Sequence, residues 1–375
     1  MLIFKLLLVA LAVGLVQRLL YGKLGLRRIQ YERRFNVPHA FAGDKIRMEE
    51  RLVNAKWLPL PWLRVETQMP AALRFGKEEL DLAVSVGQSL QNHASLFTLG
   101  PYTRIVRRHE VVCLQRGRYR IASVAITHGD LLGVTGRSLT VGSDCAITVY
   151  PRLLQARDIP RAAREWIQSA MSTPEAFRED HYYTAGVRAY RSGDALKQVN
   201  WSATARTGEL LVNRRETMIG GDVTVLLNAE LADAATNRRI SAERFEEAIS
   251  LAASAAKQVL DAGGRAGLIY NGRAGGAERV PLRIEPAGGR RQLYALLDAM
   301  ADFEPVVRLE LGYLLEDLLR ARMRGTNLLL ITAFVTPKQE EALARLRQAG
   351  NRVEVLLLHQ QRPAAAHRAA AGGMS

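Results

Sequence analysis

Polar and apolar residues alternate along much of the chain between residues 31 and 150. In segment 45–52, Ile46, Met48 and Glu50 occupy every second position, and charged residues fill the positions between them. A period of two is typical of a β-strand that buries one face. The same alternation recurs in segments 63–67, 82–86, 104–114, 117–127 and 146–150. Short strands at this spacing predict a sandwich-like β domain over residues 31–150.

The pattern changes after residue 220, where short apolar runs alternate with helical spacing. Runs typical of buried strands cover residues 222–228, 266–270, 327–332 and 352–358. Apolar residues three and four apart predict helices over residues 241–262, 290–300 and 312–324. Thr336, Pro337 and Gln339 form the start of another helix, a capping box with proline in the first turn. This alternation predicts a parallel, doubly wound α/β sheet over residues 220–359.

The N-terminal stretch is predicted to span a membrane. Residues 6–16 are wholly apolar, and Lys5 and Arg18 flank them. If both charged side chains reach the interfaces, the stretch from Leu2 to Leu20 offers about 19 residues, close to the roughly 20 that a spanning helix needs. A cleaved signal peptide and a buried core helix are the alternatives, but no A-x-A cleavage site precedes a polar segment. We expect a transmembrane helix over residues 1–22.

Basic residues follow this stretch and predict its orientation. Five of them lie within a short distance of its end: Lys23, Arg27, Arg28, Arg33 and Arg34. Positive charge remains on the cytoplasmic side, so we expect a single-pass protein of the inner (plasma) membrane with its C-terminal bulk in the cytoplasm. The same basic flank suits anionic lipid headgroups, which makes membrane lipid an expected partner.

The overall composition limits the other partners. The chain has 375 residues, enough for two or three domains, and a net charge of +15. Its arginines are spread along the chain, and no basic run is interleaved with aromatic residues, so no nucleic-acid partner is expected. The two cysteines, Cys113 and Cys145, imply no disulfide framework.

Special residues are densest between residues 188 and 212, which we call the signature segment. It follows a predicted helix over residues 160–178 and contains Tyr190, Gly193, Asp194, Asn200, Trp201, Thr204, Arg206 and Gly208. Gly193 and Asp194 are typical of a turn. The segment shows no metal-ligand spacing and no nucleophile–base pair, so a tightly packed connector is one interpretation. In that interpretation Trp201 is buried and Arg206 pairs with Asp194 or Glu209.

The spacing of these residues resembles the signature of the bacterial "domain of unknown function 58" family. The matching positions are Tyr190-x-x-Gly193-Asp194, Val199-Asn200-Trp201 and residues 203–212. One departure is Lys197, where the family usually has an arginine that could make a bidentate contact. Family members often carry two membrane spans. The resemblance implies a MoxR-type AAA+ ATPase as partner, in a chaperone-like or complex-assembly role.

The C-terminal half resembles a von Willebrand factor A domain, the usual neighbour of that signature. Such domains often hold Mg²⁺ with Asp-x-Ser-x-Ser after the first strand, where this chain has Asn228, Glu230 and Ala232. A hard cation needs oxygen ligands in a fixed geometry, so we expect no metal and no cofactor. Thr332, at the end of its strand, is expected to face the same crevice. Asn228, Glu230 and Thr332 are therefore the predicted partner-binding crevice.

Candidate catalytic residues are few. His109 and Cys113 share a strand face, which could indicate a Cys–His nucleophile pair, but no third orienting residue is evident. His181 has no partner at ligand spacing. A hydrolase using Asp194, Arg206 or Cys113 and a nucleic-acid-binding protein remain alternatives. We expect instead a membrane-anchored, non-catalytic interaction or scaffold protein.

The predicted fold class is α+β and multidomain. It comprises a transmembrane helix (1–22), a β-sandwich-like domain (31–150), a helix with the signature segment (160–219), a von Willebrand factor A-like α/β domain (220–359) and a disordered tail (360–375).

Overall fold

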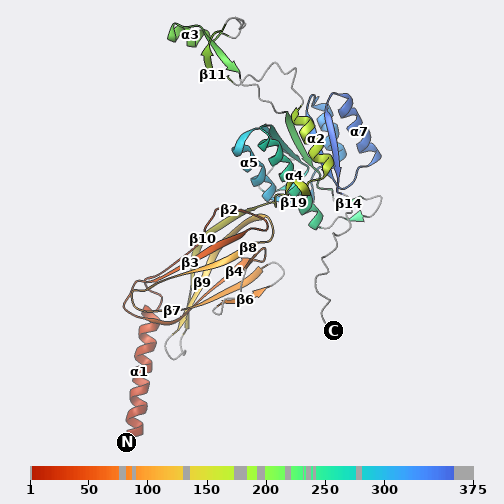
Figure 1. Ribbon diagram of the computed structural model, residues 1–375. Helices are drawn as coiled ribbons and strands as arrows, with labels where there is room; N and C mark the ends of the chain where they lie inside the picture. Colours follow the sequence, from red (N-terminus) through yellow and green to blue (C-terminus); the bar gives the residue numbers. More distant parts are fainter. Residues whose placement is uncertain are drawn as a thin grey trace, which may run out of the picture. The chain divides into compact units, whose positions relative to one another are not determined.

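The computed structural model has a mixed α+β fold with several sheets (Figure 1). It describes residues 2–75, 82–86, 90–129, 136–172, 184–191, 199–215, 221–230, 232–233, 238–239, 242–275 and 281–358. Two compact units divide the chain: the first comprises residues 1–153 and 297–303, and the second comprises residues 154–296 and 304–375. The predicted tail beyond residue 359 lies outside the described residues.

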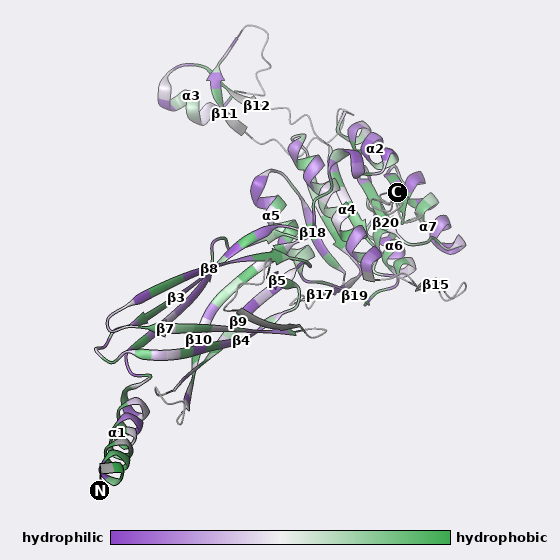
Figure 2. Ribbon diagram, turned by 60° about the horizontal axis from the view of Figure 1, so that its bottom comes forward, coloured by the Kyte–Doolittle hydropathy of each residue, from purple (hydrophilic) through white to green (hydrophobic). Residues whose placement is uncertain are grey.

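The N-terminal helix α1 (Leu2–Leu24) is long and apolar enough to cross a membrane. Figure 2 shows it as a largely hydrophobic rod. Its apolar side chains are exposed along most of its length, but Tyr21 in the last turn is buried in the core of the first unit, and Leu24 packs against that core. The helix therefore runs two residues beyond the predicted end, because its last turn packs against protein.

Two sheets that share one hydrophobic core form the rest of the first unit. The four-stranded sheet has the order β1 (Ile29–Phe35), β3 (Lys45–Asn54), β8 (Arg104–Cys113), β5 (Leu73–Phe75). The six-stranded sheet has the order β2 (His39–Phe41), β10 (Gly136–Tyr150), β9 (Gly117–Gly129), β4 (Leu60–Pro70), β7 (Leu90–Leu99), β6 (Leu82–Val86). Neighbouring strands are antiparallel except β2 and β10, which are parallel.

The predicted alternation in this unit is confirmed on strand β3. Ile46, Met48 and Glu50 are buried, and Arg47 and Arg51 between and after them are exposed. The period of two thus places an acidic residue, Glu50, on the core side of the sheet. A buried carboxylate needs charged or hydrogen-bonding partners, and the fold must supply them.

A five-stranded sheet forms the centre of the second unit. Its order is β18 (Leu282–Ala287), β16 (Arg265–Tyr270), β13 (Asp222–Leu227), β20 (Asn327–Thr332), β21 (Arg352–Leu357). The last four strands are parallel, as the strand–helix alternation predicts, and β18 is an antiparallel edge. The runs predicted as buried strands are buried in β13, β16 and β20, which helices cover, whereas the edge strand β21 buries only Val353 and Leu356.

Helices pack on both faces of the central sheet. On one face, α6 (Leu311–Arg320) and α7 (Pro337–Gln348) share a core with Ile269 and Leu226. On the other, α4 (Ala242–Asp261) places Phe245 with its ring 6.4 Å from that of Tyr270. Ile269 and Tyr270 are consecutive in their strand and so point to opposite faces. The second unit also contains η1 (Ala156–Asp158), α2 (Arg161–Ser172), β14 (Ala232–Asp233), β15 (Arg238–Arg239) and β17 (Gly272–Ala274). Helix α5 (Gly289–Ala301) and strand β19 (Phe303–Val307) each have residues in both units, because residues 297–303 belong to the first.

The signature segment forms a small hairpin with one helix. Strands β11 (Thr184–Ala189) and β12 (Leu211–Arg215) pair antiparallel, and α3 (Trp201–Thr207) lies between them in sequence. A bridge between Val199 and Val212 joins the start of the helix to the second strand. Both valines are buried, so the described part of the signature segment folds back on itself.

Candidate functional site

Three neighbouring parallel strands of the second unit end side by side, with a polar residue at or after the end of each. Asn228 follows β13, Asn271 follows β16, and Thr332 is the last residue of β20. All three side chains are buried. The structure therefore brings Asn228 and Thr332 together as the sequence predicts. It adds Asn271, which was not among the predicted residues.

Hydrogen bonds connect these three side chains into one neutral network. Asn228 Nδ2 donates to Thr332 Oγ1 at 2.9 Å, and Thr332 Oγ1 donates to the Phe334 carbonyl at 2.8 Å. Asn228 Oδ1 accepts from Asn271 Nδ2 at 2.7 Å and from the Glu230 backbone N–H at 3.1 Å. The donor and acceptor groups of the Asn228 amide are thus both used, which is what a buried amide requires.

Glu230 has a structural role at the same edge. One carboxylate oxygen accepts from the backbone N–H of Leu311, the first residue of α6, and the other accepts from Gln339 Nε2 in the first turn of α7 at 3.5 Å. The residue before α6, Glu310, makes no side-chain cap of its own. A carboxylate at a helix N-terminus satisfies an unpaired N–H and interacts favourably with the helix dipole. Glu230 is half-buried and joins two helix starts, instead of lying free in a loop.

This donor set does not fit the Mg²⁺ that a von Willebrand factor A resemblance would imply. Asn228 Oδ1 already faces two N–H donors, and both oxygens of Glu230 face N–H donors as well. A hard cation would have to displace these donors from every oxygen it used. The arrangement is one of mutually satisfied polar groups, and no chemical step follows from it.

Most described residues of the signature segment have a local structural role. Asn200 caps α3 through a bond from the Ala203 N–H to its Oδ1 at 2.9 Å. Thr204 Oγ1 accepts from the Leu211 N–H at 3.0 Å, which ties the helix to β12. Gly208 ends the helix with a φ of 76°, a conformation that glycine adopts without strain. Tyr190 donates its backbone N–H to the carbonyl of Leu210.

One expectation about the packed connector is wrong, and a second is tested only for one of its two partners. Trp201 is 65% exposed, because α3 buries none of its residues and the hairpin beside it is too small to cover an indole. Arg206 is also exposed, and the described residues show no ion pair between it and Glu209. Gly193, Asp194, Lys197 and His181 lie outside the described residues.

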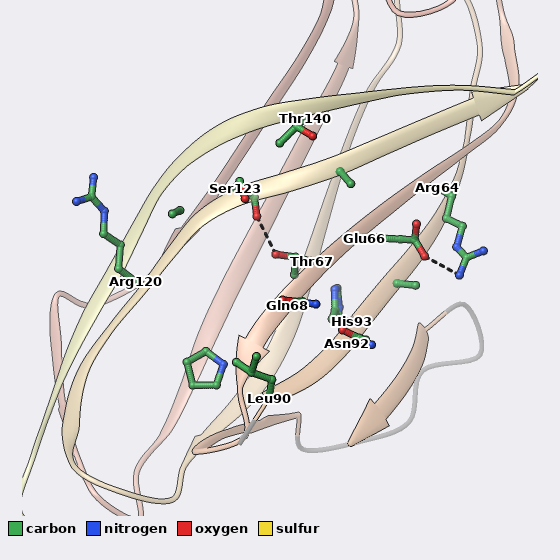
Figure 3. A pocket seen from close by; sticks show the side chains of 14 residues that line it. Arg64, Glu66, Thr67, Gln68, Leu90, Asn92, His93, Arg120, Ser123 and Thr140 are labelled. Atoms are coloured by element: carbon green, nitrogen blue, oxygen red, sulfur yellow. Dashed lines mark hydrogen bonds and ion pairs between the residues drawn. The ribbon is translucent and has the colours of Figure 1, made fainter. Parts of the chain in front are cut away.

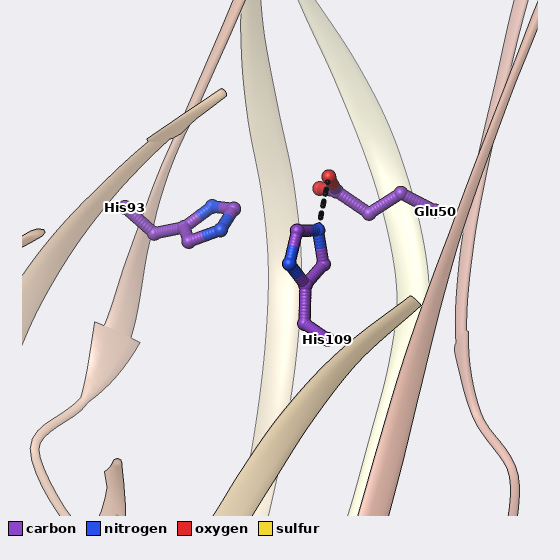
Figure 4. Close-up of side chains that lie close together, drawn as sticks. All are labelled: Glu50, His93 and His109. Atoms are coloured by element: carbon purple, nitrogen blue, oxygen red, sulfur yellow. Dashed lines mark hydrogen bonds and ion pairs between the residues drawn. The ribbon is translucent and has the colours of Figure 1, made fainter. Parts of the chain in front are cut away.

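A second polar cluster lies inside the first unit, where Glu50 meets two histidines, His93 and His109 (Figure 4), and also Arg33. Glu50 Oε1 pairs with Arg33 and accepts from the Tyr31 hydroxyl at 2.8 Å. Glu50 Oε2 lies 3.1 Å from His109 Nε2 and accepts from the Ser95 hydroxyl at 3.2 Å. Each oxygen of the carboxylate thus has two partners, which offsets the cost of burying a charge.

The electrostatics of this cluster follow from its burial. Burial alone would raise the pKa of Glu50, but the hydrogen bond from His109 and the charge of Arg33 bring the pKa far below its usual range. Burial lowers the pKa of His93 to about 3, and the charge of Arg33 contributes to this lowering. Glu50 is therefore ionised and His93 neutral at pH 7.

Glu50, His93 and His109 could geometrically hold a metal ion, because their ligand atoms lie within 4.8 Å of one another. Arg33 argues against this use. Its guanidinium pairs with Glu50, and its Nη2 lies 3.5 Å from His93 Nδ1. A metal cation would have to enter beside this buried positive charge with only one carboxylate to balance both. We interpret the cluster as an ion-pair network whose resident cation is Arg33.

His109 and Cys113 do not form a nucleophile–base pair. Four residues along a strand separate their Cα atoms by about 13 Å. His109 contacts Glu50 instead, and burial raises the pKa of the Cys113 thiol to about 11. A thiol with that pKa is protonated at neutral pH and is a weak nucleophile.

An open pocket of about 890 Å³ lies on the six-stranded sheet of the first unit (Figure 3). Strands β4, β7, β9 and β10 contribute its lining. Arg64 pairs with Glu66 at 2.7 Å, and the Thr67 hydroxyl donates to the Ser123 carbonyl at 3.2 Å. These polar groups satisfy one another and converge on no common point, so the pocket does not indicate a reaction.

Comparison with known proteins supports the resemblance seen in the signature segment. Residues 186–367 match the family model described as "Protein of unknown function DUF58". A relative named "Uncharacterized protein YeaD", from Bacillus subtilis, is 24% identical over 340 residues, which cover 90% of this chain and 77% of the relative.

Solved structures show only weak likeness to this chain. A non-cellulosomal cohesin from Archaeoglobus fulgidus is 12% identical, with a TM-score of 0.23, and the match covers 32% of this chain and 91% of the cohesin. The major pilin SpaD from Corynebacterium diphtheriae is 11% identical, with a TM-score of 0.24, and the match covers 31% of this chain and 33% of the pilin. TM-scores this low support no conclusion about function.

Proposed function

We propose that this protein is a membrane-anchored, non-catalytic scaffold whose second unit binds a protein partner, a MoxR-type AAA+ ATPase, in chaperone-like complex assembly. The observation that carries this proposal is the neutral network at the edge of the central sheet. Doubly wound sheets bind ligands at the carboxyl ends of their strands. Here that edge is filled by Asn228, Asn271 and Thr332, which bond to one another. An edge whose buried polar groups already satisfy one another gives a rigid support for protein contact at its rim and leaves none of the three side chains for catalysis.

The second unit is, in this proposal, a von Willebrand factor A-like domain. Four parallel strands in the order β16-β13-β20-β21, with helices on both faces, support this interpretation. The match of residues 186–367 to the DUF58 family is consistent with it.

The anchor is α1. Its length and composition support a single pass through the inner membrane, and the exposed Lys23 in its last turn and Arg27 and Arg28 just after it favour a cytoplasmic location for both units. A cytoplasmic location would give the second unit access to an ATPase partner.

The contact surface is the rim of the crevice, because Asn228 and Thr332 are themselves buried. The backbone N–H groups of Arg308 and Leu309 bond to the Asn271 carbonyl, which places the segment before α6 directly beside the network. Tyr313, in the first turn of α6, is 65% exposed. Exposed tyrosines beside a rigid, well-packed support are typical of interface hot spots.

Binding of purified full-length protein in nanodiscs to a purified MoxR-type ATPase, with ATP present, tests the proposal. We expect Tyr313→Ala to weaken binding about tenfold or more, as loss of a hot-spot aromatic does. Tyr294→Ala is the matched control, because Tyr294 is also an exposed tyrosine on a helix of this unit. Glu230→Lys is a poorer test, since it also removes the contact at the start of α6. Absence of binding by the wild-type chain would refute the partnership. Equal binding by Tyr313→Ala and Tyr294→Ala would show that the contact surface does not include the rim at Tyr313.

A further inference from the structure

The end of α1 is fixed to one end of the β unit by side-chain and backbone bonds. Lys56 Nζ donates to the Gly25 carbonyl at 2.7 Å, and the Ala55 N–H donates to the Arg28 carbonyl at 3.1 Å. Gly25 itself is packed so closely against His128 of β9 that a Cβ there would clash with the imidazole ring. The helix therefore leaves the unit from a defined position, with loop 55–58 directly beside it.

A second loop completes the same end of the unit. The Tyr102 N–H donates to the Lys56 carbonyl at 3.1 Å, and Asn54 Nδ2 donates to the Gly100 carbonyl at 2.8 Å. Loops 55–58 and 100–103 thus lie side by side next to the exit of α1.

Two large aromatic side chains point outward from this surface. Trp57 is 57% exposed and Tyr102 is 72% exposed. Tyr102 also has a φ of 49°, a left-handed conformation that costs a non-glycine residue energy. A turn that holds a tyrosine in this conformation at its tip, without burying the ring, is consistent with a binding role for the ring.

Within the described segments that form it, this surface carries positive charge only. Lys23, Arg27, Arg28 and Arg104 are exposed around the two aromatics. The three segments involved, residues 21–30, 53–62 and 99–106, contain no aspartate or glutamate. A basic surface with exposed Trp and Tyr complements anionic lipid headgroups, among which amphipathic aromatic rings are favoured.

The length of α1 sets the height of this surface relative to a membrane. The 22 residues of the apolar span, Ile3 to Leu24, rise about 33 Å as a helix, slightly more than the roughly 30 Å of a hydrocarbon core. If α1 spans the bilayer, its last turn reaches the interface. Loop 55–58 is hydrogen-bonded to the residues just after α1, and loop 100–103 is hydrogen-bonded to loop 55–58, so both loops then lie in the headgroup region.

We infer that this end of the β unit, centred on Trp57 and Tyr102, is a membrane-docking surface that seats both rings among the headgroups of the bilayer that α1 crosses. The inference rests on the proposed membrane anchoring. It adds that the β unit is held against the membrane by its own side chains, so that α1 and the docking surface are two separate attachment points of the first unit.

Tryptophan quenching by brominated lipids tests this docking surface. The full-length chain is reconstituted in phosphatidylethanolamine–phosphatidylglycerol vesicles with lipids brominated near the headgroup end of the acyl chain. Trp57→Phe is expected to remove most of the bromolipid quenching of the wild-type chain. Trp201→Phe is the matched control, because that indole is equally exposed but lies in the second unit, and we expect it to leave the quenching intact.

A second variant and a separate extraction keep the outcomes distinguishable. Adding Tyr102→Trp to the Trp57→Phe chain should restore quenching, since both positions lie on the same surface. Unchanged quenching in Trp57→Phe, or no recovery in the double variant, overturns the docking surface. Carbonate extraction reports on the anchor alone: a chain released by carbonate overturns the membrane anchoring and this inference together. A chain that resists extraction while its Trp57 is not quenched overturns only the inference.

Discussion

Replacing Thr332 with valine tests whether the buried network holds the edge of the central sheet together. The substitution keeps the shape of the side chain and removes one hydroxyl. Asn228 Nδ2 then loses its acceptor at 2.9 Å, and the Phe334 carbonyl loses its donor at 2.8 Å. An unsatisfied buried donor costs about 1–3 kcal/mol. Phe334 is only half-buried, so water replaces part of its bond, and we expect a total of about 2 kcal/mol.

Hydrogen exchange measured by mass spectrometry suits this test, because two units need not unfold together. A loss of about 2 kcal/mol corresponds to roughly 30-fold faster exchange where local opening controls the rate. The effect should appear in peptides that cover β13 and β20. Thr326→Val is the matched control: Thr326 directly precedes the same strand, and its hydroxyl makes only a 3.4 Å contact with the Arg324 carbonyl. Equal protection in Thr332→Val and wild type would show that the Asn228 amide does not depend on this hydroxyl.

Three further perturbations follow from the same contacts. Trp201→Ala should change the free energy of unfolding by less than about 0.5 kcal/mol, since the ring is exposed, and a larger loss in thermal unfolding would contradict the structure. Glu230→Gln should destabilise the start of α6 by about 0.5–1 kcal/mol through loss of the charge–dipole interaction, seen as faster exchange in α6 but not in α4. The pKa of His93, about 3 when folded against about 6.5 unfolded, means that the unfolded chain binds the extra proton. The contribution of neutral His93 to the free energy of unfolding should therefore be fully present above pH 6.5 and fall by up to about 1.4 kcal/mol for each pH unit towards pH 3. His93→Phe should flatten the dependence of this free energy on pH over that range. An unchanged pH dependence would refute the low pKa of His93.

Local patterns were sufficient to predict the longer helices and about half of the strands, but β1 and β7 were missed. The period of two placed Glu50 on the buried face, and the capping box of α7 is confirmed by the bonds between Thr336 and Gln339. Strand β18 was missed, because its sequence combines two charged residues with Pro286 and has no apolar run. Helix α6 ends at Arg320, earlier than predicted, and Arg322 has a left-handed φ of 53° in the turn that follows.

Contacts between distant segments were harder to predict. The partners of Glu50 come from strands that are 17 and 43 positions away, at Arg33 and His93, and no local pattern indicates that pairing. Asn271 could have been found, since it follows a predicted strand as Asn228 does. The expectation for Trp201 failed for a different reason: a large aromatic residue suggests burial, but the hairpin around it is too small to provide a core.

The neutral network of Asn228, Asn271 and Thr332 has a consequence for how binding at the edge of the central sheet could be regulated. Its three side chains carry no net charge and take up neither protons nor cations to form their bonds. In domains whose edge is completed by a divalent ion, the concentration of that ion can switch binding on and off. Here the edge is assembled without an ion, so this chain's side of the proposed contact should need no divalent cation.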